Sequence, residues 1–186
     1  MILPRRWGAA IFGALLLISS PITASATDSP FPFKIGGPFS LADHDGNSVT
    51  DGDFRGRFML IYIGYTYCPD ICPTNLQVMG TALSALGAKD PKAALRVTPV
   101  FVTIDPERDT SELLKEYVAN FHPNMVGLRG DALQTKAMAD AYRMHFLKVV
   151  PEGSEPEDYL MNHSSITFLM GPEGELVTLF PHDTTP

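Results

Sequence analysis

The only two cysteines of this chain, Cys68 and Cys72, are separated by three residues. They follow an apolar run at 58–63, rich in isoleucine and aromatic residues, that predicts a central strand buried on both faces. Apolar residues then recur at helical spacing over 74–86, with Thr74 as the expected N-cap. The two sulfurs are therefore expected where a strand meets a helix. The free N–H groups and the dipole of a helix N-terminus favour thiolates at such a place.

Two cysteine side chains on one helical turn can converge. They can then form a reversible disulfide, or they can bind a soft metal ion through two thiolates. An oxidising compartment turns an idle pair into a disulfide, and two cysteines are too few for a disulfide-scaffolded fold. We therefore expect a redox-active pair that is kept usable by reductants, or a pair that is protected by a metal.

Residues 1–26 have the layout of a secretory signal peptide. Arg5 and Arg6 form a positive start, residues 7–18 are apolar, and 24–26 offer a small-residue cleavage site. The alternative is an uncleaved membrane anchor, although the apolar stretch is shorter than the roughly 20 residues that a spanning helix needs. Either way, we expect an exported protein, in the periplasm or anchored to the periplasmic face of the inner membrane.

Composition narrows the class of protein further. Residues 27–34 contain two prolines and predict a linker, which leaves 35–186 for one folded domain. The chain is 45% hydrophobic, enough for a substantial core, and its net charge is −7. Because no basic cluster follows the N-terminal segment, nucleic acid is disfavoured as a partner. A membrane surface is a candidate partner through the N-terminal segment.

Strand and helix patterns alternate along the rest of the chain. A hairpin is expected over 39–50, and a second hairpin closes the chain with strands at 166–170 and 175–180. The other expected elements are strands at 97–104, 126–128 and 146–150, and helices at 111–121 and 132–145. This order predicts an α/β three-layer sandwich with a mixed central sheet. A cysteine pair at the first strand–helix junction is the thioredoxin-like arrangement, to which the N-terminal hairpin is an addition.

One histidine is a candidate third partner for the cysteines. His163 lies in 159–165, before a strand, and in thioredoxin-like folds the loop at this place faces the cysteines. Two thiolates and one imidazole form a soft site that suits Cu(I), and the nitrogen lets it hold Cu(II). Structural zinc fits less well, because it usually takes four ligands. Asp105 is expected on the same rim, where it would orient the ligands from behind. The remaining histidines are expected to have surface or capping roles: His44, His122, His145 and His182.

Three motifs together resemble the Sco/SenC family. They are Cys-Pro-Asp-Ile-Cys-Pro-Thr at 68–74, Ile-Asp-Pro-Glu-Arg-Asp-Thr at 104–110 and Asn-His-Ser at 162–164. The likeness runs from about residue 33 to residue 180. The resemblance implies a thioredoxin-like domain that binds one copper ion, as Cu(I) or Cu(II), through both cysteines and the histidine.

The resemblance also implies a function. It points to a copper chaperone or thiol reductase for the binuclear copper centre of cytochrome c oxidase, and so to a metallochaperone rather than an ordinary enzyme. The implied partners are the copper-bearing subunit of the oxidase and other copper chaperones or thiol reductants. Two alternatives stay open: a copper-independent thiol–disulfide oxidoreductase that uses Cys68 and Cys72, and a thiol peroxidase.

Two features depart from the family pattern. Asn162 stands where the family often has an aspartate before the histidine. The sequence ends at Pro186, whereas family members usually continue into a C-terminal helix. We therefore expect this chain to lack that helix and to expose the apolar sheet surface that the helix would cover.

Overall fold

The structure, a computed structural model, describes residues 34–186. The expected signal peptide or anchor at 1–26, and all but the last residue of the expected linker at 27–34, lie outside the described residues. Within 34–186, no helix is long and apolar enough to cross a membrane.

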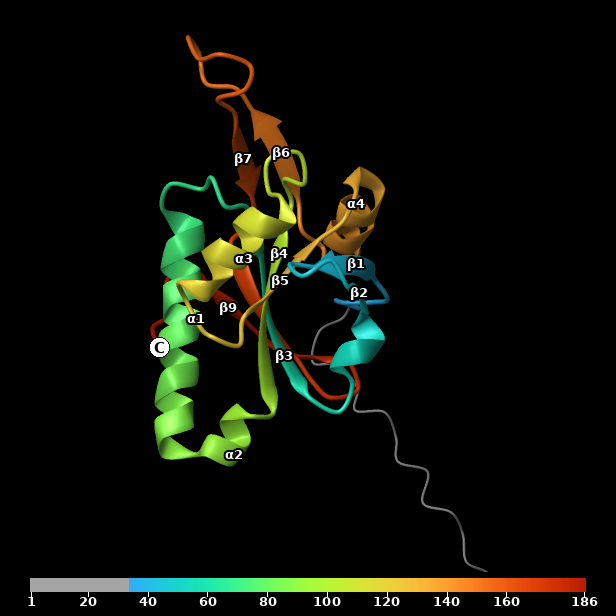
Figure 1. Ribbon diagram of the computed structural model, residues 1–186, viewed down its shortest axis with the longest axis vertical. Coiled ribbons are helices and arrows are strands. Elements are labelled where there is room, and N and C mark those ends of the chain that lie inside the picture. The colour runs from blue at the N-terminus through green and yellow to red at the C-terminus, as the bar shows by residue number, and fades with distance from the viewer. Residues whose placement is uncertain (1–33) are drawn as a thin grey trace, which may run out of the picture.

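A mixed sheet of seven strands forms the middle layer of the fold (Figure 1). Its order is β2-β1-β5-β4-β3-β8-β9; β3, β4 and β5 run parallel, and the other pairs are antiparallel. The strands are β1 (Ser40–Asp43), β2 (Ser48–Thr50), β3 (Phe58–Gly64), β4 (Val97–Thr103), β5 (Val126–Arg129), β8 (Ile166–Met170) and β9 (Leu176–Pro181). The predicted mixed sheet, the N-terminal hairpin β1–β2 and the closing hairpin β8–β9 are confirmed.

Helices cover both faces of this sheet. Because β3, β4 and β5 are consecutive parallel neighbours, right-handed crossovers put both connecting helices on one face, and the next helix lies on the other (Figure 1). The connecting helices are α1 (Ile71–Lys89) and α3 (Ser111–Ala119), and the opposite one is α4 (Ala132–Ala141). Two short helices, η1 (Asp51–Phe54) and α2 (Pro91–Ala94), were not expected. The core lies on both sides of β3 and β4, where Ile61, Tyr62, Val100 and Phe101 are fully buried.

The prediction for the start of α1 was wrong in a way that matters for the cysteines. The helix begins at Ile71, so Cys72 lies in its first turn, and Asp70 rather than Thr74 is at the N-cap position. The Thr74 hydroxyl instead donates a hydrogen bond to the carbonyl oxygen of Asp70. Pro73 does not stop the helix, because an N–H in the first turn has no intrahelical acceptor to lose.

The helix expected over 132–145 ends earlier, at Ala141. Arg143 has a positive φ of 55°, and the N–H groups of Arg143 and Met144 donate to the carbonyl oxygens of Asp140 and Ala139. These two bonds form a Schellman motif. No glycine marks this helix end in the sequence, which explains why the predicted helix was too long.

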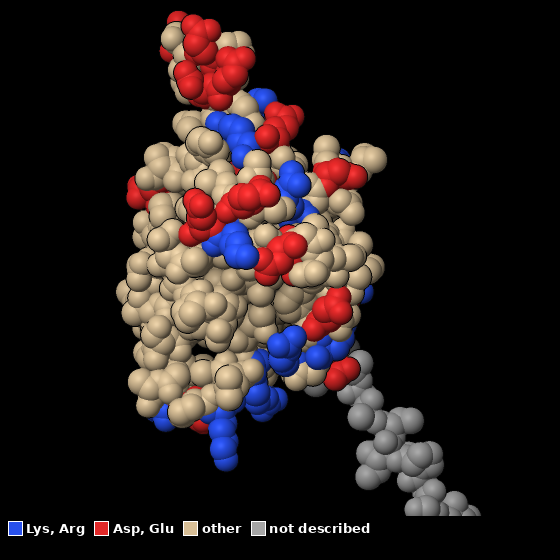
Figure 2. Space-filling model, in the orientation of Figure 1, with Lys and Arg blue, Asp and Glu red and all other residues tan. Residues whose placement is uncertain are grey.

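The segment before β8 is a strand and not a loop. β7 (Leu160–His163) pairs with β6 (Phe146–Val149) in a separate two-stranded sheet, with His163 opposite Phe146. This hairpin projects beyond the main sheet, and acidic side chains gather at its tip (Figures 1 and 2). The connection between the two strands contains four acidic residues and no lysine or arginine.

An apolar groove of about 300 Å³ lies between α1 and the strands β8 and β9. Met79, Leu83, Leu169 and Phe180 contribute to its walls, as do the last residues of the chain. No helix follows β9 within the described residues.

Candidate metal centre

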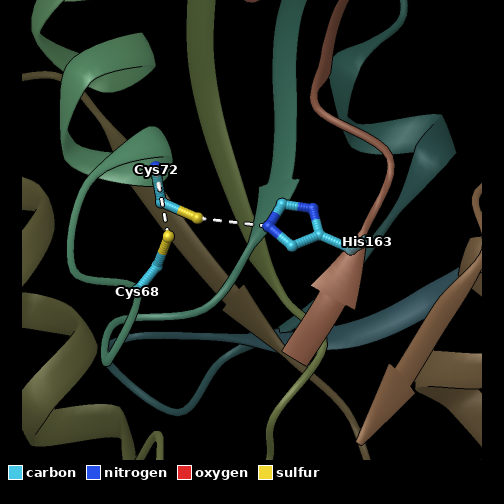
Figure 3. A group of neighbouring side chains, drawn as sticks. All are labelled: Cys68, Cys72 and His163. Atoms are coloured by element: carbon cyan, nitrogen blue, oxygen red, sulfur yellow. Dashed lines mark hydrogen bonds between the residues drawn. The ribbon is translucent and has the colours of Figure 1, made fainter. Parts of the chain in front are cut away.

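Cys68, Cys72 and His163 converge beyond the end of β3 (Figure 3). The two sulfurs and one imidazole nitrogen all lie within 4.8 Å of one another. Cys72 Sγ is 3.4 Å from His163 Nε2, and the Cys72 N–H donates to Cys68 Sγ at 3.3 Å. Both cysteines are free thiols. The structure thus brings together the three side chains that the sequence singled out, across 91 positions of chain.

The junction between β3 and α1 positions the two cysteines. Cys68 lies in the connecting loop and is half-buried, whereas Cys72 lies in the first helical turn and has no exposed surface. Gly64, the last residue of β3, lets Cys72 come close: a Cβ atom at position 64 would lie 2.8 Å from Cys72 Sγ. A glycine is required there because of this close approach.

The backbone fixes the tautomer of His163. Its Nδ1 lies 2.9 Å from the carbonyl oxygen of Ser164. Since a carbonyl oxygen only accepts, Nδ1 carries the proton, and the lone pair of Nε2 points toward the sulfurs. The rings of Tyr62 and Tyr65 meet the imidazole edge-on, with centroids 6.3 and 5.8 Å away. The imidazole is therefore oriented as a ligand through Nε2.

The pKa values of the two cysteines are shifted in opposite directions. A hydrogen bond from the Cys72 thiol lowers the pKa of Cys68; burial opposes this effect, and hydrogen bonds from the backbone support it. The same bond to Cys68, together with burial, raises the pKa of Cys72. The metal-free site thus carries a thiolate on the more exposed sulfur and a thiol on the buried one.

A buried polar network, which was not predicted from the sequence, lies behind Cys72. The Tyr62 hydroxyl is 3.8 Å from Cys72 Sγ and 2.9 Å from Ser165 Oγ. Asn75 donates from Nδ2 to the Tyr62 oxygen at 3.4 Å. Burial raises the pKa of Tyr62, so the phenol is a neutral donor toward the sulfur. Of these residues, only Asn75 could have been noticed in the sequence. It is a polar residue one helical turn after Cys72, on a buried face of the helix.

Asp109 fastens the loop that carries Cys68. This fully buried carboxylate accepts hydrogen bonds from the N–H and hydroxyl of Thr66 and from the hydroxyl of Thr103. Arg129 donates to the Asp109 carbonyl oxygen at 3.0 Å. Burial raises the pKa of Asp109. Asp109 belongs to the 104–110 motif, but the sequence alone does not predict this role for it.

Asp105 lies on the rim where it was expected, but it does not touch the proposed ligands. Its carboxylate accepts from Arg108 Nε at 2.6 Å and from the Tyr159 hydroxyl at 2.7 Å. No hydrogen bond joins it to Cys68, Cys72 or His163 in the described part of the chain. Its carboxylate instead links Arg108 to Tyr159, which directly precedes the strand that carries His163.

A cleft of about 360 Å³ opens onto the site. Cys68 and His163 lie in its wall, with Ile71, Val149 and Leu160 as apolar neighbours. His182, expected to have a surface role, is exposed and also lines this cleft. The cleft gives an ion, or the thiol of another protein, access to the half-buried sulfur.

The donor set fits a soft ion of low coordination number. Two sulfurs and one imidazole nitrogen suit copper in both of its common oxidation states. They fall short of the four ligands usual for structural zinc. No carboxylate belongs to this cluster within the described residues, so a hard ion such as Mg²⁺ or Ca²⁺ has no fitting set here.

Comparisons with known proteins agree with this geometry. The SCO1/SenC family matches residues 27–186. Protein sco1 of Schizosaccharomyces pombe is 41% identical over 154 residues, which cover 82% of this chain and 57% of that protein. The SCO2-like protein of Rickettsia felis is 37% identical over 180 residues, covering 94% and 85% respectively. This chain spans only about half the length of several curated relatives, among them the human mitochondrial SCO1 homolog at 47%.

Solved structures share the fold. Arabidopsis thaliana ScoI with copper bound has a TM-score of 0.74 at 38% identity, over 81% of this chain and 90% of that one. Bradyrhizobium japonicum ScoI with copper bound has a TM-score of 0.73 at 39% identity, over 82% and 92%. The predicted thioredoxin-like α/β fold is thus confirmed. A family match that includes every described residue, with relatives near 40% identity, makes this protein a member of the SCO1/SenC family.

Proposed function

We propose that this protein binds one copper ion through Cys68, Cys72 and His163 and delivers it to the copper-bearing subunit of cytochrome c oxidase. The observation that carries the proposal is the convergence of two sulfurs and a correctly oriented imidazole nitrogen within 4.8 Å. Relatives solved with copper bound, and family membership, support copper as the cargo.

The ligands have different parts in this proposal. The two thiolates hold Cu(I), which accepts low coordination, and the imidazole adds the third ligand that Cu(II) needs. Cys68 faces the cleft, so its sulfur is the one that a partner's ligand reaches first. Transfer then exchanges one ligand at a time, and copper is never released to water.

The cysteine pair also supports a second function, the reduction of a partner's disulfide. The Cys68 thiolate attacks one sulfur of that disulfide and forms a mixed disulfide; Cys72 then attacks Cys68, and the partner leaves with both thiols reduced. The two electrons come from the pair, which an exported thiol reductant must reduce again. A relative at 25% identity, BsSco, is described as having a disulfide switch.

No observation favours the peroxidase alternative. In the described chain, no arginine is a hydrogen-bond partner of either sulfur. Arg108, which lies near the rim, instead bonds Asp105 and Tyr159.

We further propose that the protein is exported and works in the periplasm, either free after cleavage near Thr27 or anchored to the inner membrane. The support is the layout of residues 1–26 and the bacterial origin of relatives such as the Rickettsia protein. N-terminal sequencing of the periplasmic and membrane fractions tests it. Recovery of the protein in the soluble cytoplasmic fraction alone would contradict it.

Copper titration of the reduced protein tests the main proposal. The wild type should take up one Cu(I) per chain, and the Cu(II) form should show a sulfur-to-copper charge-transfer band. Cys68→Ala and Cys72→Ala should each abolish the band. His122→Ala is the matched control: it removes an imidazole from the connection between α3 and β5, and it should change neither the copper stoichiometry nor the band. A His163→Ala variant with wild-type affinity and spectrum for both oxidation states would refute the three-ligand site.

A further inference from the structure

The proposed ligands belong to two different sheets. The cysteines follow β3 of the seven-stranded sheet, whereas His163 ends β7, which pairs with β6 in a separate sheet. No backbone ladder joins the two sheets within residues 34–186. The distance between the imidazole and the sulfurs therefore depends on side chains and on the short connection from β7 to β8.

Arg108 contacts the start of β7. Its Nη1 donates to the carbonyl oxygen of Tyr159 at 2.9 Å, and its guanidinium carbon lies 3.6 Å from the centre of the Tyr159 ring. Asp105 closes this arrangement, because one carboxylate oxygen accepts from Arg108 Nε and the other accepts from the Tyr159 hydroxyl. Since Asp105 follows β4, the three residues join the main sheet to the hairpin.

The same guanidinium faces the loop that carries Cys68. It lies 4.7 Å from the centre of the Tyr67 ring and 6.0 Å from that of Tyr65. Tyr67 directly precedes Cys68, and the ring of Tyr65 meets His163 edge-on. Arg108 thus contacts residues that flank both parts of the proposed site.

The surroundings of Arg108 are not those of an ordinary surface ion pair. Its side chain is only 18% exposed, its partner Asp105 is 3% exposed, and Arg108 Nη2 is buried without a hydrogen-bond partner among residues 34–186. Leaving a buried donor unpaired lowers stability. The position of the guanidinium is therefore set by the rings and backbone that it joins, at the expense of one of its own hydrogen bonds.

We propose that Arg108 is a positioning residue, which holds the strand carrying His163 against the loop carrying Cys68 and Cys72. The inference rests on the proposed copper site. Asp105 and Tyr159 act together with Arg108 in this proposal, and we call the three residues the tether. Because Cu(I) is satisfied by two thiolates while Cu(II) needs the imidazole, the tether sets how tightly the site holds Cu(II) relative to Cu(I).

Arg108→Met tests the tether, since methionine keeps apolar packing over the rings but removes the charge and the fork of donors. We expect its Cu(II) affinity to fall by about 10-fold or more, as for other residues that orient ligands. Its Cu(I) affinity should stay within about 3-fold of that of the wild type, and it should still bind one copper ion per chain. Arg108→Lys keeps the charge without the planar fork and should not restore Cu(II) affinity. The control is Arg55→Met, which removes an exposed arginine paired with Asp51.

A double-mutant cycle separates positioning from general damage. In a His163→Ala background, Arg108→Met should cause no further loss of Cu(II) affinity, because the ligand that it positions is gone. An equal loss in both backgrounds would overturn the proposal. Equal losses of Cu(I) and Cu(II) affinity, or full rescue by Arg108→Lys, would overturn it as well.

A measurement on the metal-free protein keeps this inference separate from the copper proposal. Arg108→Met should speed hydrogen exchange at the backbone amides of β7 and leave those of β3 unchanged. If the wild type failed to bind copper, the proposed function would fall, and faster exchange in β7 alone would still support the tether. Unchanged exchange in β7 would refute the tether whatever the copper result.

Discussion

The two sides of the proposed site are built very differently. On the cysteine side, β3 has a hydrogen-bonded neighbour on each edge, Asp109 fixes the loop, and Cys72 is completely buried. On the histidine side, β7 pairs with only one strand in the described part of the chain, and the hairpin exposes large apolar side chains, including Leu147 at 65% and Leu160 at 42%. Segments with few buried contacts open at lower free energy than the core.

This difference would suit the proposed function, in which the protein holds a copper ion and then passes it to a partner. The rigid side keeps two sulfurs at a fixed separation, so Cu(I) always finds a formed pair. The weakly packed side can move away with one ligand while the core stays folded. The following predictions test whether this division between a rigid and a movable side is real.

The largest effect is expected from oxidation of the rigid side. A disulfide between Cys68 and Cys72 has no anionic sulfur to offer, so fully oxidised protein should bind no copper at all. Copper and free thiols are counted on the same sample after desalting, and bound copper should in turn slow thiol alkylation. Stoichiometric copper in a sample without free thiols would show that the sulfurs are not the ligands.

Gly64→Ala should damage the rigid side. The new methyl group would lie 2.8 Å from Cys72 Sγ, so the sulfur must move. Overpacking of a core usually destabilises by about 1–3 kcal/mol, and we expect such a loss together with weaker binding of Cu(I) and Cu(II) alike. Urea unfolding and copper titration measure the two effects. Gly37→Ala is the control, because its nearest neighbour would be at an ordinary 3.7 Å; equal effects of both substitutions would contradict the prediction.

Much of the rigid side could be predicted from the sequence, because its signals are local. The apolar run of β3, the cysteine spacing and the periodicity of α1 are each contained in a short stretch of chain. Even so, the first turn of α1 was missed, since Pro73 looked like a boundary. The contacts of Tyr62 with Asn75 and Ser165 depend on how distant segments pack, and no local pattern encodes them.

The movable side was predicted less well for a physical reason. The place of His163 before β8 predicts its role, but the sequence pattern predicts a loop there instead of the strand β7. β7 has only four residues, and its partner β6 lies more than ten positions earlier, beyond an acidic connection. Asp105 was placed on the right rim, yet its bonds to Arg108 and Tyr159 arise only when the hairpin folds back.

The pH dependence of alkylation should differ between the two sulfurs. The hydrogen bond from Cys72 lowers the pKa of Cys68 below the usual 9.0 of a thiol, so Cys68 stays a reactive thiolate well into the acidic range. Cys72 has a raised pKa and is buried, so it should react slowly even in mildly alkaline solution. Iodoacetamide labelling of metal-free protein at pH 6 and pH 8, read by peptide mass spectrometry, checks this. In urea both cysteines should follow one profile; identical profiles in the folded protein would contradict the assignment.

The smallest expected effects are changes in the free energy of unfolding when a single side chain is altered on each side of the site. Ile61 in β3 is fully buried, so Ile61→Val removes one methylene group from a packed core and should destabilise by about 0.5–1.5 kcal/mol. Leu147 in β6 is 65% exposed, and Leu147→Thr should change stability by less than about 0.5 kcal/mol. Both are measured by urea unfolding of metal-free protein. If Leu147→Thr were the more destabilising change, the hairpin would be packed more firmly than its exposure indicates. It could then not serve as the movable side of the site.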